Sequence, residues 1–357
     1  MARLGPLLGA ALLSAAMQAP AAEPAPQAGA ALRLRVVGGL AGITQYAQLE
    51  APFWTRDLAR LSQGRFDADI VPFDRAGVPG MEMLRLLELG VVPFGTVFMS
   101  SLSDRYPQYM AADLPGLNPD FAALRRSLAV FRPYLERALR EEHGIELLAV
   151  YVYPAQVVFC KQPFDGLADL RGRRVRVSSA AQGDFVSALE AHPRHVPFAR
   201  LAQSMEAGTS ECAITGAMPG NAMGLHMYAA YLYPMPISWG MAIFGANGAA
   251  WKALPEELRA LLRSELPRLE TAIWLSAEQE TLQGVDCNVG SPRCTTGRRG
   301  RMALVPVRPQ DEARREDILR TVVLPRWLQR CGARCADLWN RRSEEHTSEL
   351  QSLRHLV

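Results

Sequence analysis

Residues 165–177 read DGLADLRGRRVRV, and this stretch indicates the architecture of the chain. Its last part, from Arg173 to Val177, alternates charged and apolar side chains, which is the period of a half-buried β-strand. The alternation places Arg174 and Arg176 on one face of the strand and Arg173 on the other. A planar guanidinium offers two parallel N–H donors to a carboxylate, so an arginine on this strand could bind an anion. The alternative is a surface arginine of an ordinary strand.

Strands and helices alternate on the N-terminal side of this stretch. The pattern predicts strands at Leu32–Val37, Phe66–Val71 and Val91–Met99, with helices at Gln45–Ser62 and Val78–Gly90 between them. A β-α-β-α-β order implies a parallel sheet with crossover helices.

A second set of strands and helices follows. Two predicted strands, Ile145–Tyr151 and Gln156–Cys160, are separated at Pro154, which indicates a crossing from one lobe to another. Pro234–Phe244 is extended and apolar, and we expect it to return to the first lobe. The remaining predicted elements are strands at Arg173–Val177, Arg194–Pro197 and Glu211–Thr215, and helices at Phe121–Glu142, Ala180–Ala191, Ala199–Glu206, Pro255–Leu282 and Asp311–Trp339.

The two ends of the chain are set apart from this pattern. Residues 1–22 combine Arg3, an apolar run and small residues suited to cleavage, which predicts a signal peptide; residues 23–31 form a Pro- and Ala-rich linker. No cysteine precedes Cys160, so no lipid anchor is predicted. Residues 342–352 read RSEEHTSELQS, which is similar to the conceptual translation of a sequencing adapter. We therefore exclude residues 342–357 from the predicted fold.

Composition excludes several classes of function. The chain is 49% hydrophobic and 21% charged, which is typical of a globular protein, and its net charge of +3 is too small to indicate a nucleic-acid partner. Residues 298–301, RRGR, form a local basic turn that we interpret as a solvated loop.

Six cysteines permit disulfides in an exported chain. Cys287 and Cys294 flank a turn-like stretch that could join them, and cross-pairing with Cys331 or Cys335 is equally open. Cys331 and Cys335 lie four apart on a predicted helix, where a mutual bridge would be strained. The other two lie in strand-like runs and can be plain buried thiols. The pairing stays open among Cys160, Cys212, Cys287, Cys294, Cys331 and Cys335.

No motif in the sequence indicates catalysis or a cofactor. There is no G-x-S-x-G, H-E-x-x-H or P-loop, and the glycine turn at 38–42 lacks the dinucleotide-binding spacing. The histidines do not cluster with cysteines or carboxylates at metal-ligand spacing. We therefore expect a binding protein without catalytic residues, metal or cofactor.

Three stretches resemble the periplasmic solute-binding subunits of tripartite ATP-independent (TRAP) transporters. The first is residues 165–177, which resembles the segment that leads to the family's binding arginine. The second is ECAITGA at 211–217, and the third is YPMPISWG at 233–240 followed by NGAAWKALP at 247–255. The resemblance then extends more weakly over residues 32–282.

This resemblance implies that Arg176 forms a bidentate ion pair with a ligand carboxylate. Many members carry a second arginine on the strand near residues 152–159, where this chain has Gln156. An amide donates hydrogen bonds but carries no charge. This difference favours a ligand with one carboxylate over a dianion held by two arginines. The other candidate ligand-binding residues lie at predicted strand ends around the cleft, and they are Gln45, Tyr46, Thr96, Phe98, Gln156, Thr215, Asn221 and Trp239.

The resemblance implies a two-lobed periplasmic-binding-protein-like α/β fold of type II, each lobe a mainly parallel sheet flanked by helices. Lobe 1 is expected at 32–152 with 237–254 returning to it, lobe 2 at 153–236, and long helices packing across both at 255–341. The implied function is capture of a small organic anion in the periplasm for integral membrane TRAP subunits, with no insertion into the membrane. The alternatives are a binding protein of another importer or sensor, and a periplasmic enzyme on a similar fold.

Overall fold

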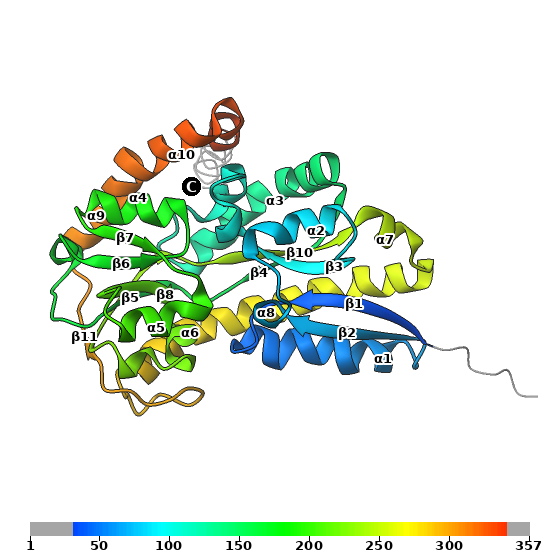
Figure 1. The fold of residues 1–357 in the computed structure, drawn as a ribbon, viewed down its shortest axis with the longest axis horizontal. Helices are drawn as coiled ribbons and strands as arrows, with labels where there is room; N and C mark the ends of the chain where they lie inside the picture. The colour runs from blue at the N-terminus through cyan, green and yellow to red at the C-terminus, as the bar shows by residue number, and fades with distance from the viewer. Residues whose placement is uncertain (1–30, 341–357) are drawn as a thin grey trace, which may run out of the picture.

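The computed structural model describes residues 31–340 of the 357-residue chain. The predicted signal peptide and the adapter-like tail lie outside the described residues. Two α/β lobes lie side by side, each built on one sheet, with lobe 1 on the right and lobe 2 on the left of Figure 1. The two-lobed α/β prediction is confirmed, and the sheets are mixed because strands that cross between the lobes run antiparallel to their neighbours.

The sheet of lobe 1 has the order β2-β1-β3-β10-β4. β1 pairs in parallel with β2 and β3, as the β-α-β-α-β pattern predicts, whereas β10 is antiparallel to both β3 and β4. The strands are β1 (Leu32–Gly38), β2 (Phe66–Pro72), β3 (Phe94–Phe98), β4 (Ile145–Val152) and β10 (Met241–Asn247). The helices of this lobe are η1 (Gln45–Glu50), η2 (Phe53–Asp57), α1 (Leu58–Leu61), α2 (Met83–Glu88), α3 (Phe121–His143) and α7 (Gly248–Ala253).

The sheet of lobe 2 has the order β11-β9-β5-β8-β6-β7. β6, which carries Arg176, pairs in parallel with β7 and β8. The strands are β5 (Gln156–Cys160), β6 (Arg174–Val177), β7 (His192–His195), β8 (Cys212–Gly216), β9 (Tyr231–Ser238) and β11 (Ala303–Leu304). The helices are α4 (Ala180–Ala188), α5 (Leu201–Glu206), α6 (Ala217–Ala222), α9 (Pro309–Ile318), η10 (Leu319–Val323) and α10 (Leu324–Cys331). Short 3-10 turns join these elements at η3 (Phe73–Arg75), η4 (Gly80–Glu82), η5 (Met99–Leu102), η6 (Pro107–Asp113), η7 (Leu167–Leu170), η8 (Phe198–Arg200) and η9 (Leu225–Met227).

The chain crosses between the lobes from β4 to β5, from β9 to β10, and along α8 (Glu256–Asn288). The stretch 234–244, predicted as one extended segment, breaks at Trp239 and Gly240. Gly240 has φ +84°, and its position suits glycine because an added Cβ would lie 2.8 Å from Nε2 of Gln156. α8 packs against β4 and η1 in lobe 1 and against α6 and β9 in lobe 2.

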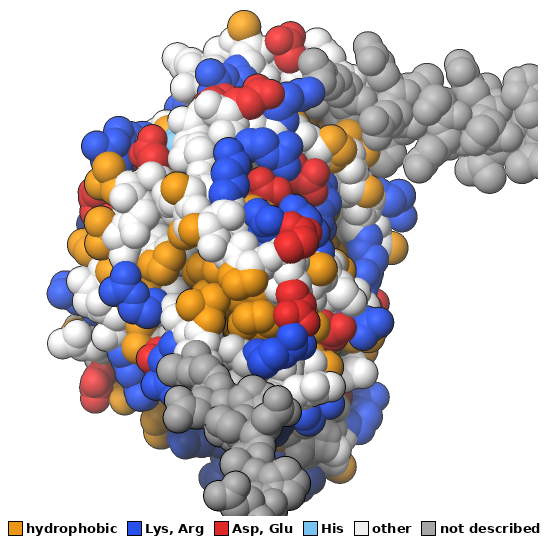
Figure 2. Space-filling model, turned by 90° about the vertical axis from the view of Figure 1, so that its right-hand side faces the viewer, with side chains coloured by type: hydrophobic (Ala, Val, Ile, Leu, Met, Phe, Trp, Pro, Cys, Tyr) orange, Lys and Arg blue, Asp and Glu red, His pale blue; other side chains and the backbone are white. Residues whose placement is uncertain are grey.

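Apolar cores lie on both faces of the lobe 1 sheet. On one face Trp54 is fully buried and packs 5.5 Å from the ring of Phe244, with Leu258 and Leu262 of α8 in the same core. The core on the other face continues into lobe 2. The surface at the lobe 1 end shows basic and acidic side chains interspersed around an apolar patch (Figure 2).

The structure pairs all six cysteines, as Cys160–Cys212, Cys287–Cys294 and Cys331–Cys335. The interpretation of Cys160 and Cys212 as plain thiols is corrected, because β5 and β8 place them directly opposite each other. The predicted helix Asp311–Trp339 is also interrupted. α10 ends at Cys331 and Gly332 has φ +66°, so Cys331 and Cys335 do not share one regular helix.

We expect Gly284→Ala to destabilise the protein, because α6 and α8 approach each other at this glycine. An added Cβ would lie 2.3 Å from the backbone nitrogen of Met218. Overpacking of this kind costs about 1–3 kcal/mol, and backbone atoms cannot rotate away as a side chain can. The free energy of unfolding, measured by urea denaturation, should fall by about 2 kcal/mol even after the higher helix propensity of alanine is included.

Gly42→Ala is the matched control, since an added Cβ there meets nothing within 4 Å. Its free energy of unfolding should stay within about 0.5 kcal/mol of wild type. Equal stability of the two variants would contradict the close approach of α6 and α8.

Candidate functional site

A small cavity lies between the lobes, beside the two strand crossings. It encloses about 10 Å³, close to the volume that one water-sized sphere occupies, so the lobes must part before a larger molecule can enter. Lobe 1 contributes mostly thioether and polar side chains, and lobe 2 contributes amides and hydroxyls. The lining residues are Met99, Ser100, Met110, Asp113, Gln156, Ser178, Ser179, Gln182, Ser238, Gly240 and Met241.

A neutral hydrogen-bond network forms the lobe 2 wall of this cavity. Nε2 of Gln182 donates to Oγ of Ser238 at 2.8 Å and also to Oε1 of Gln156. Oγ of Ser238 donates to the same Gln156 oxygen at 3.1 Å. The backbone N–H and the hydroxyl of Ser178 donate to Oε1 of Gln182 at 2.8 and 3.0 Å. Amides and hydroxyls both donate and accept, so this wall can orient a polar ligand without charge.

The N-terminus of α4 lies at the same wall. Ser179 caps the helix by accepting from the backbone N–H of Gln182 at 3.2 Å. The next backbone N–H, of Ala180, donates to Oγ of Ser103 in lobe 1 at 3.2 Å, which joins the lobes across the cleft. A helix N-terminus favours negative charge, so an anion is stabilised on this side of the cavity.

Arg176 lies two residues before Ser178 and is 3% exposed. Its Nε donates to the carbonyl of Val196 and its Nη1 to the carbonyl of Ile214, both at 2.8 Å. Val196 directly follows β7 and Ile214 lies two residues before the end of β8, so the guanidinium lies near the carboxyl ends of the strands that flank β6. No carboxylate within the described part of the chain forms an ion pair with Arg176. Burial lowers the pKa of Arg176 to about 10, which leaves the side chain cationic at neutral pH.

Two buried carboxyl groups lie on the lobe 1 side. Glu50 accepts from the backbone N–H of Gly39 at 2.6 Å and from the hydroxyl of Thr96 at 3.1 Å. Asp113 accepts from the backbone N–H groups of Trp239 and Gly240 at 2.9 and 2.8 Å, and so holds the β9–β10 crossing. Burial raises the pKa of Glu50 and of Asp113 to about 7.

An apolar contact also joins the lobes. Phe198, which η8 presents from lobe 2, packs with Leu40 and Phe98 against a small buried cluster in lobe 1 and the adjacent crossing. The rings of Phe98 and Tyr153 lie 5.6 Å apart within this contact. The backbone carbonyl of Val196, which accepts from Arg176, lies only two residues before Phe198.

The predicted site residues of lobe 1 gather near Glu50 and the strand ends. Thr96 is buried against Glu50, and Tyr46 lies so near Gly38 that an added Cβ there would meet its ring at 2.7 Å. Burial, and next the charge of Glu50, raise the pKa of Tyr46. Gln45 instead donates to Glu280 of α8 at 3.0 Å.

Gln156 is the predicted site residue that lines the cavity itself. Thr215 is buried at the end of β8, next to the carbonyl that Arg176 contacts. Trp239, expected to wall the cleft, is instead buried behind the crossing, where its indole N–H donates to the carbonyl of Asn118 at 3.0 Å. Asn221, expected to reach the ligand, is fully buried and exchanges hydrogen bonds with the backbone of Arg298.

Sequence reasoning did not single out Gln182, Ser238 or Asp113. Gln182 lies at the start of the predicted helix Ala180–Ala191, just after the predicted strand Arg173–Val177, so its position beyond a strand end was its signal. Ser238 and Asp113 reach the cavity only because distant segments meet there. Within residues 31–340, no group of three His, Cys, Asp or Glu side chains is placed to hold a metal ion. None of the helices described in this range is both long and apolar enough to cross a membrane.

Comparison with known families gives one match that covers most of the chain. The model of the bacterial extracellular solute-binding proteins, family 7, matches residues 41–285. This segment contains every strand of both sheets except β1 and β11. No curated protein matches the chain.

Solved structures show the same fold. An extracytoplasmic solute receptor of Bordetella pertussis that binds pyroglutamic acid has 22% identity and a TM-score of 0.77, over 88% of this chain and 100% of that one. A TRAP periplasmic solute-binding protein of Desulfovibrio salexigens with bound orotic acid has 17% identity and a TM-score of 0.77, over 88% and 99%. One from Pseudomonas aeruginosa with bound L-malate has 15% identity and a TM-score of 0.71, over 81% and 98%.

The raised pKa of Glu50 predicts a loss of stability with rising pH. Its ordinary pKa is 4.5 and its folded pKa is about 7, so the folded state binds the proton more tightly. The stabilisation is complete below about pH 4.5 and is lost as the pH rises through about 7. Urea denaturation at pH 5 and pH 8 should show that wild type loses about 2–3 kcal/mol more than Glu50→Gln over this interval.

The exposed substitution Glu278→Gln is the control and should follow wild type. Asp113 contributes a change of the same sign in all three proteins, because its pKa is also raised by burial. An identical pH dependence of wild type and Glu50→Gln would show that Glu50 is not desolvated.

Proposed function

The chain belongs to family 7 of the bacterial extracellular solute-binding proteins, and we propose that it captures a small monocarboxylate between its lobes, with Arg176 as the anchor. The observation that carries the proposal is a buried guanidinium with no carboxylate partner in the described chain, at the edge of the sheet beside the cavity. Such an extracytoplasmic receptor delivers its ligand to membrane subunits of a TRAP-type transporter.

The number of N–H donors that the guanidinium has left for a ligand supports Arg176 as the anchor. A guanidinium has five N–H donors, and backbone carbonyls take two of them, so three remain, one on Nη1 and two on Nη2. Nη1 and Nη2 together can donate in parallel to the two oxygens of one carboxylate. A buried cation without a counter-charge is costly, and a bound anion relieves that cost. The charge and the geometry therefore favour the same ligand group.

The cavity lining supports a ligand with one charge. Gln156, Gln182 and the serines of the lobe 2 wall are neutral, and neither arginine nor lysine is among the residues that line the cavity. A second carboxylate would face amide and hydroxyl groups without a cation. A neutral group that both donates and accepts hydrogen bonds, such as the lactam of pyroglutamate, matches Gln156 and Ser238. The pyroglutamate-binding receptor of similar fold supports this choice.

Ligand capture requires the lobes to open and close about the crossings. The hinge positions are residues 153–155 and 239–240, where the chain leaves one sheet and enters the other. The contacts of Ala180 with Ser103 and of Phe198 with lobe 1 support a closed arrangement of the lobes. We place the protein in the periplasm and assign it no catalytic step, because its family binds solutes and the one carboxyl group in the cavity lining, Asp113, accepts the backbone N–H groups of Trp239 and Gly240.

Arg176→Met should weaken binding of pyroglutamate by at least about a hundredfold, because two charge-assisted hydrogen bonds are lost. Thermal-shift screening of small organic acids should first show that pyroglutamate raises the melting temperature, and titration calorimetry then gives the dissociation constants. Arg174→Met is the matched control, since Arg174 lies on the same strand and pairs with Glu211. Its dissociation constant should stay within about threefold of wild type. Unchanged binding in a folded Arg176→Met protein would refute the anchor.

Gln156→Arg should shift the preference toward dicarboxylates. A second cation at this place can pair with the far carboxylate of malate and removes the acceptor that a lactam N–H would use. The ratio of malate to pyroglutamate affinity should rise by about tenfold or more. Gln203→Arg, an exposed change on α5, adds the same charge and should leave the ratio unchanged. An equal rise in both variants would attribute the effect to net charge alone.

A further inference from the structure

A basic loop lies at the end of lobe 2, beyond the segment that the family model matches. We call residues 289–301 the basic loop; it follows α8 and leads into β11. Two segments meet here, residues 217–238 and 287–310, and neither contains an Asp or a Glu. Their arginines are Arg293, Arg298, Arg299, Arg301 and Arg308.

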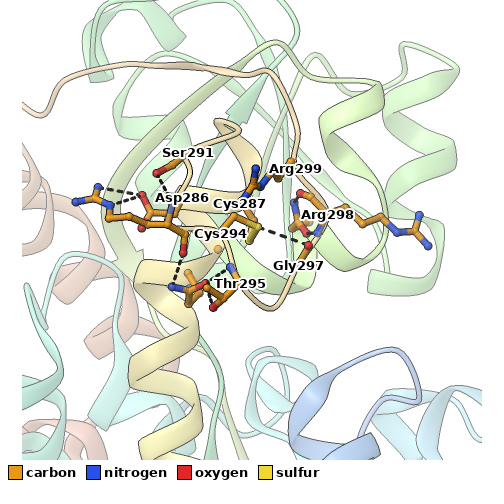
Figure 3. Close-up of a disulfide and its surroundings, with 12 residues drawn as sticks. Asp286, Cys287, Ser291, Cys294, Thr295, Gly297, Arg298 and Arg299 are labelled. Atoms are coloured by element: carbon orange, nitrogen blue, oxygen red, sulfur yellow. Dashed lines mark hydrogen bonds and ion pairs between the residues drawn. A yellow bond between two sulfur atoms is a disulfide. The ribbon is translucent and has the colours of Figure 1, made fainter.

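The basic loop is held firmly to lobe 2. The Cys287–Cys294 disulfide closes its first part, and the backbone N–H of Gly300 donates to the carbonyl of Cys287 at 2.7 Å. Both polar atoms of the Asn221 amide bond to the backbone of Arg298, at 2.7 and 2.8 Å. Figure 3 shows the disulfide enclosed by the loop, with Arg298 and Arg299 on the part of the loop that passes beside it. The arginines therefore project from a fixed platform.

The charges of this loop are largely uncompensated. Arg293 pairs with Asp286 of α8 at 3.0 Å. Arg298, Arg299 and Arg301 are exposed and form no ion pair with any described residue. The Arg299 guanidinium donates instead to a neutral backbone carbonyl, that of Pro292, at 3.3 Å. By contrast, the lobe 1 end shows both signs of charge interspersed (Figure 2).

Exposed apolar side chains stand beside these arginines. Met227 of η9 is 63% exposed, and η9 adjoins the loop, since an added Cβ at Gly300 would lie 2.8 Å from Cβ of His226. Leu304 is 50% exposed on β11, directly after the loop. Arginines that surround protruding apolar side chains are typical of proteins that lie on a phospholipid surface.

We propose that the basic loop, with Met227 and Leu304, docks peripherally on an anionic phospholipid membrane. The guanidiniums bind lipid phosphates, which accept parallel N–H donors, and the apolar tips enter the headgroup layer. The interpretation of residues 298–301 as a merely solvated loop is replaced by this one. Three exposed arginines without an ion pair among the described residues favour a membrane over a protein partner, because protein interfaces pattern both signs to fix their register.

Vesicle co-sedimentation of the mature, oxidised protein tests this docking. Vesicles of phosphatidylglycerol and phosphatidylcholine in equal parts should bind the protein, pure phosphatidylcholine should not, and high salt should release it. Each arginine near an anionic surface strengthens binding about fivefold, so Arg298→Ala/Arg299→Ala/Arg301→Ala should weaken it about a hundredfold. Met227→Ser should weaken it by about tenfold, through the lost apolar contact.

The control triple, Arg56→Ala/Arg60→Ala/Arg85→Ala, removes the same net charge from exposed positions of lobe 1 and should bind within about threefold of wild type. Equal losses in the two triples would overturn the proposal by making the effect one of net charge. Failure of the wild type to bind either vesicle would also overturn it, and would leave an acidic protein surface as the occupant. The assay needs no ligand, so its outcome is independent of the proposed carboxylate function.

Discussion

A buried guanidinium that the protein leaves without a counter-charge is the constraint on which the site depends. Two backbone carbonyls at the ends of neighbouring strands fix Arg176, but carbonyl dipoles do not neutralise a cation. The surrounding sheet must therefore be stable enough to hold a desolvated charge. The core of lobe 2 supplies that stability, with Val175, Val177 and the Cys160–Cys212 bridge packed around the strand. On the function proposed above, this uncompensated charge is what selects an anionic ligand.

The crossing between the lobes depends on a buried carboxyl group, Asp113. Asp113 accepts the backbone N–H groups of Trp239 and Gly240, which have no strand partner where β9 gives way to β10. Those N–H groups would otherwise be buried and unsatisfied. Because Gly240 adopts a left-handed conformation beside Gln156, the same turn also lets the amide wall approach the crossing. The crossing and the cavity are thus built from one set of contacts.

The sequence predicted features that depend on local pattern. Alternation along residues 173–177 gave the strand and the face of Arg176, and the order of elements gave two lobes. It could not give contacts that depend on how distant segments meet. Asn221 bonds to a loop 77 residues away, and Cys160 meets Cys212 only through the register of β5 and β8. Nor could the sequence place Trp239, because an aromatic residue at a strand end can pack in the core as well as line the cleft.

On the function proposed above, one short segment, residues 196–198, couples the charge of the ligand to closure of the lobes. Nε of Arg176 donates to Val196, and two residues later Phe198 packs on lobe 1. A carboxylate on the free edge of the guanidinium would fix its orientation and thereby the loop that carries Phe198. The other lobe-to-lobe contacts, such as Ala180 to Ser103, are neutral and weak individually, so they permit opening. On this proposal, apolar and neutral contacts hold the closed lobes together, and the one buried cation is left for the ligand. Ligand binding therefore shifts the equilibrium toward the closed form without making closure irreversible.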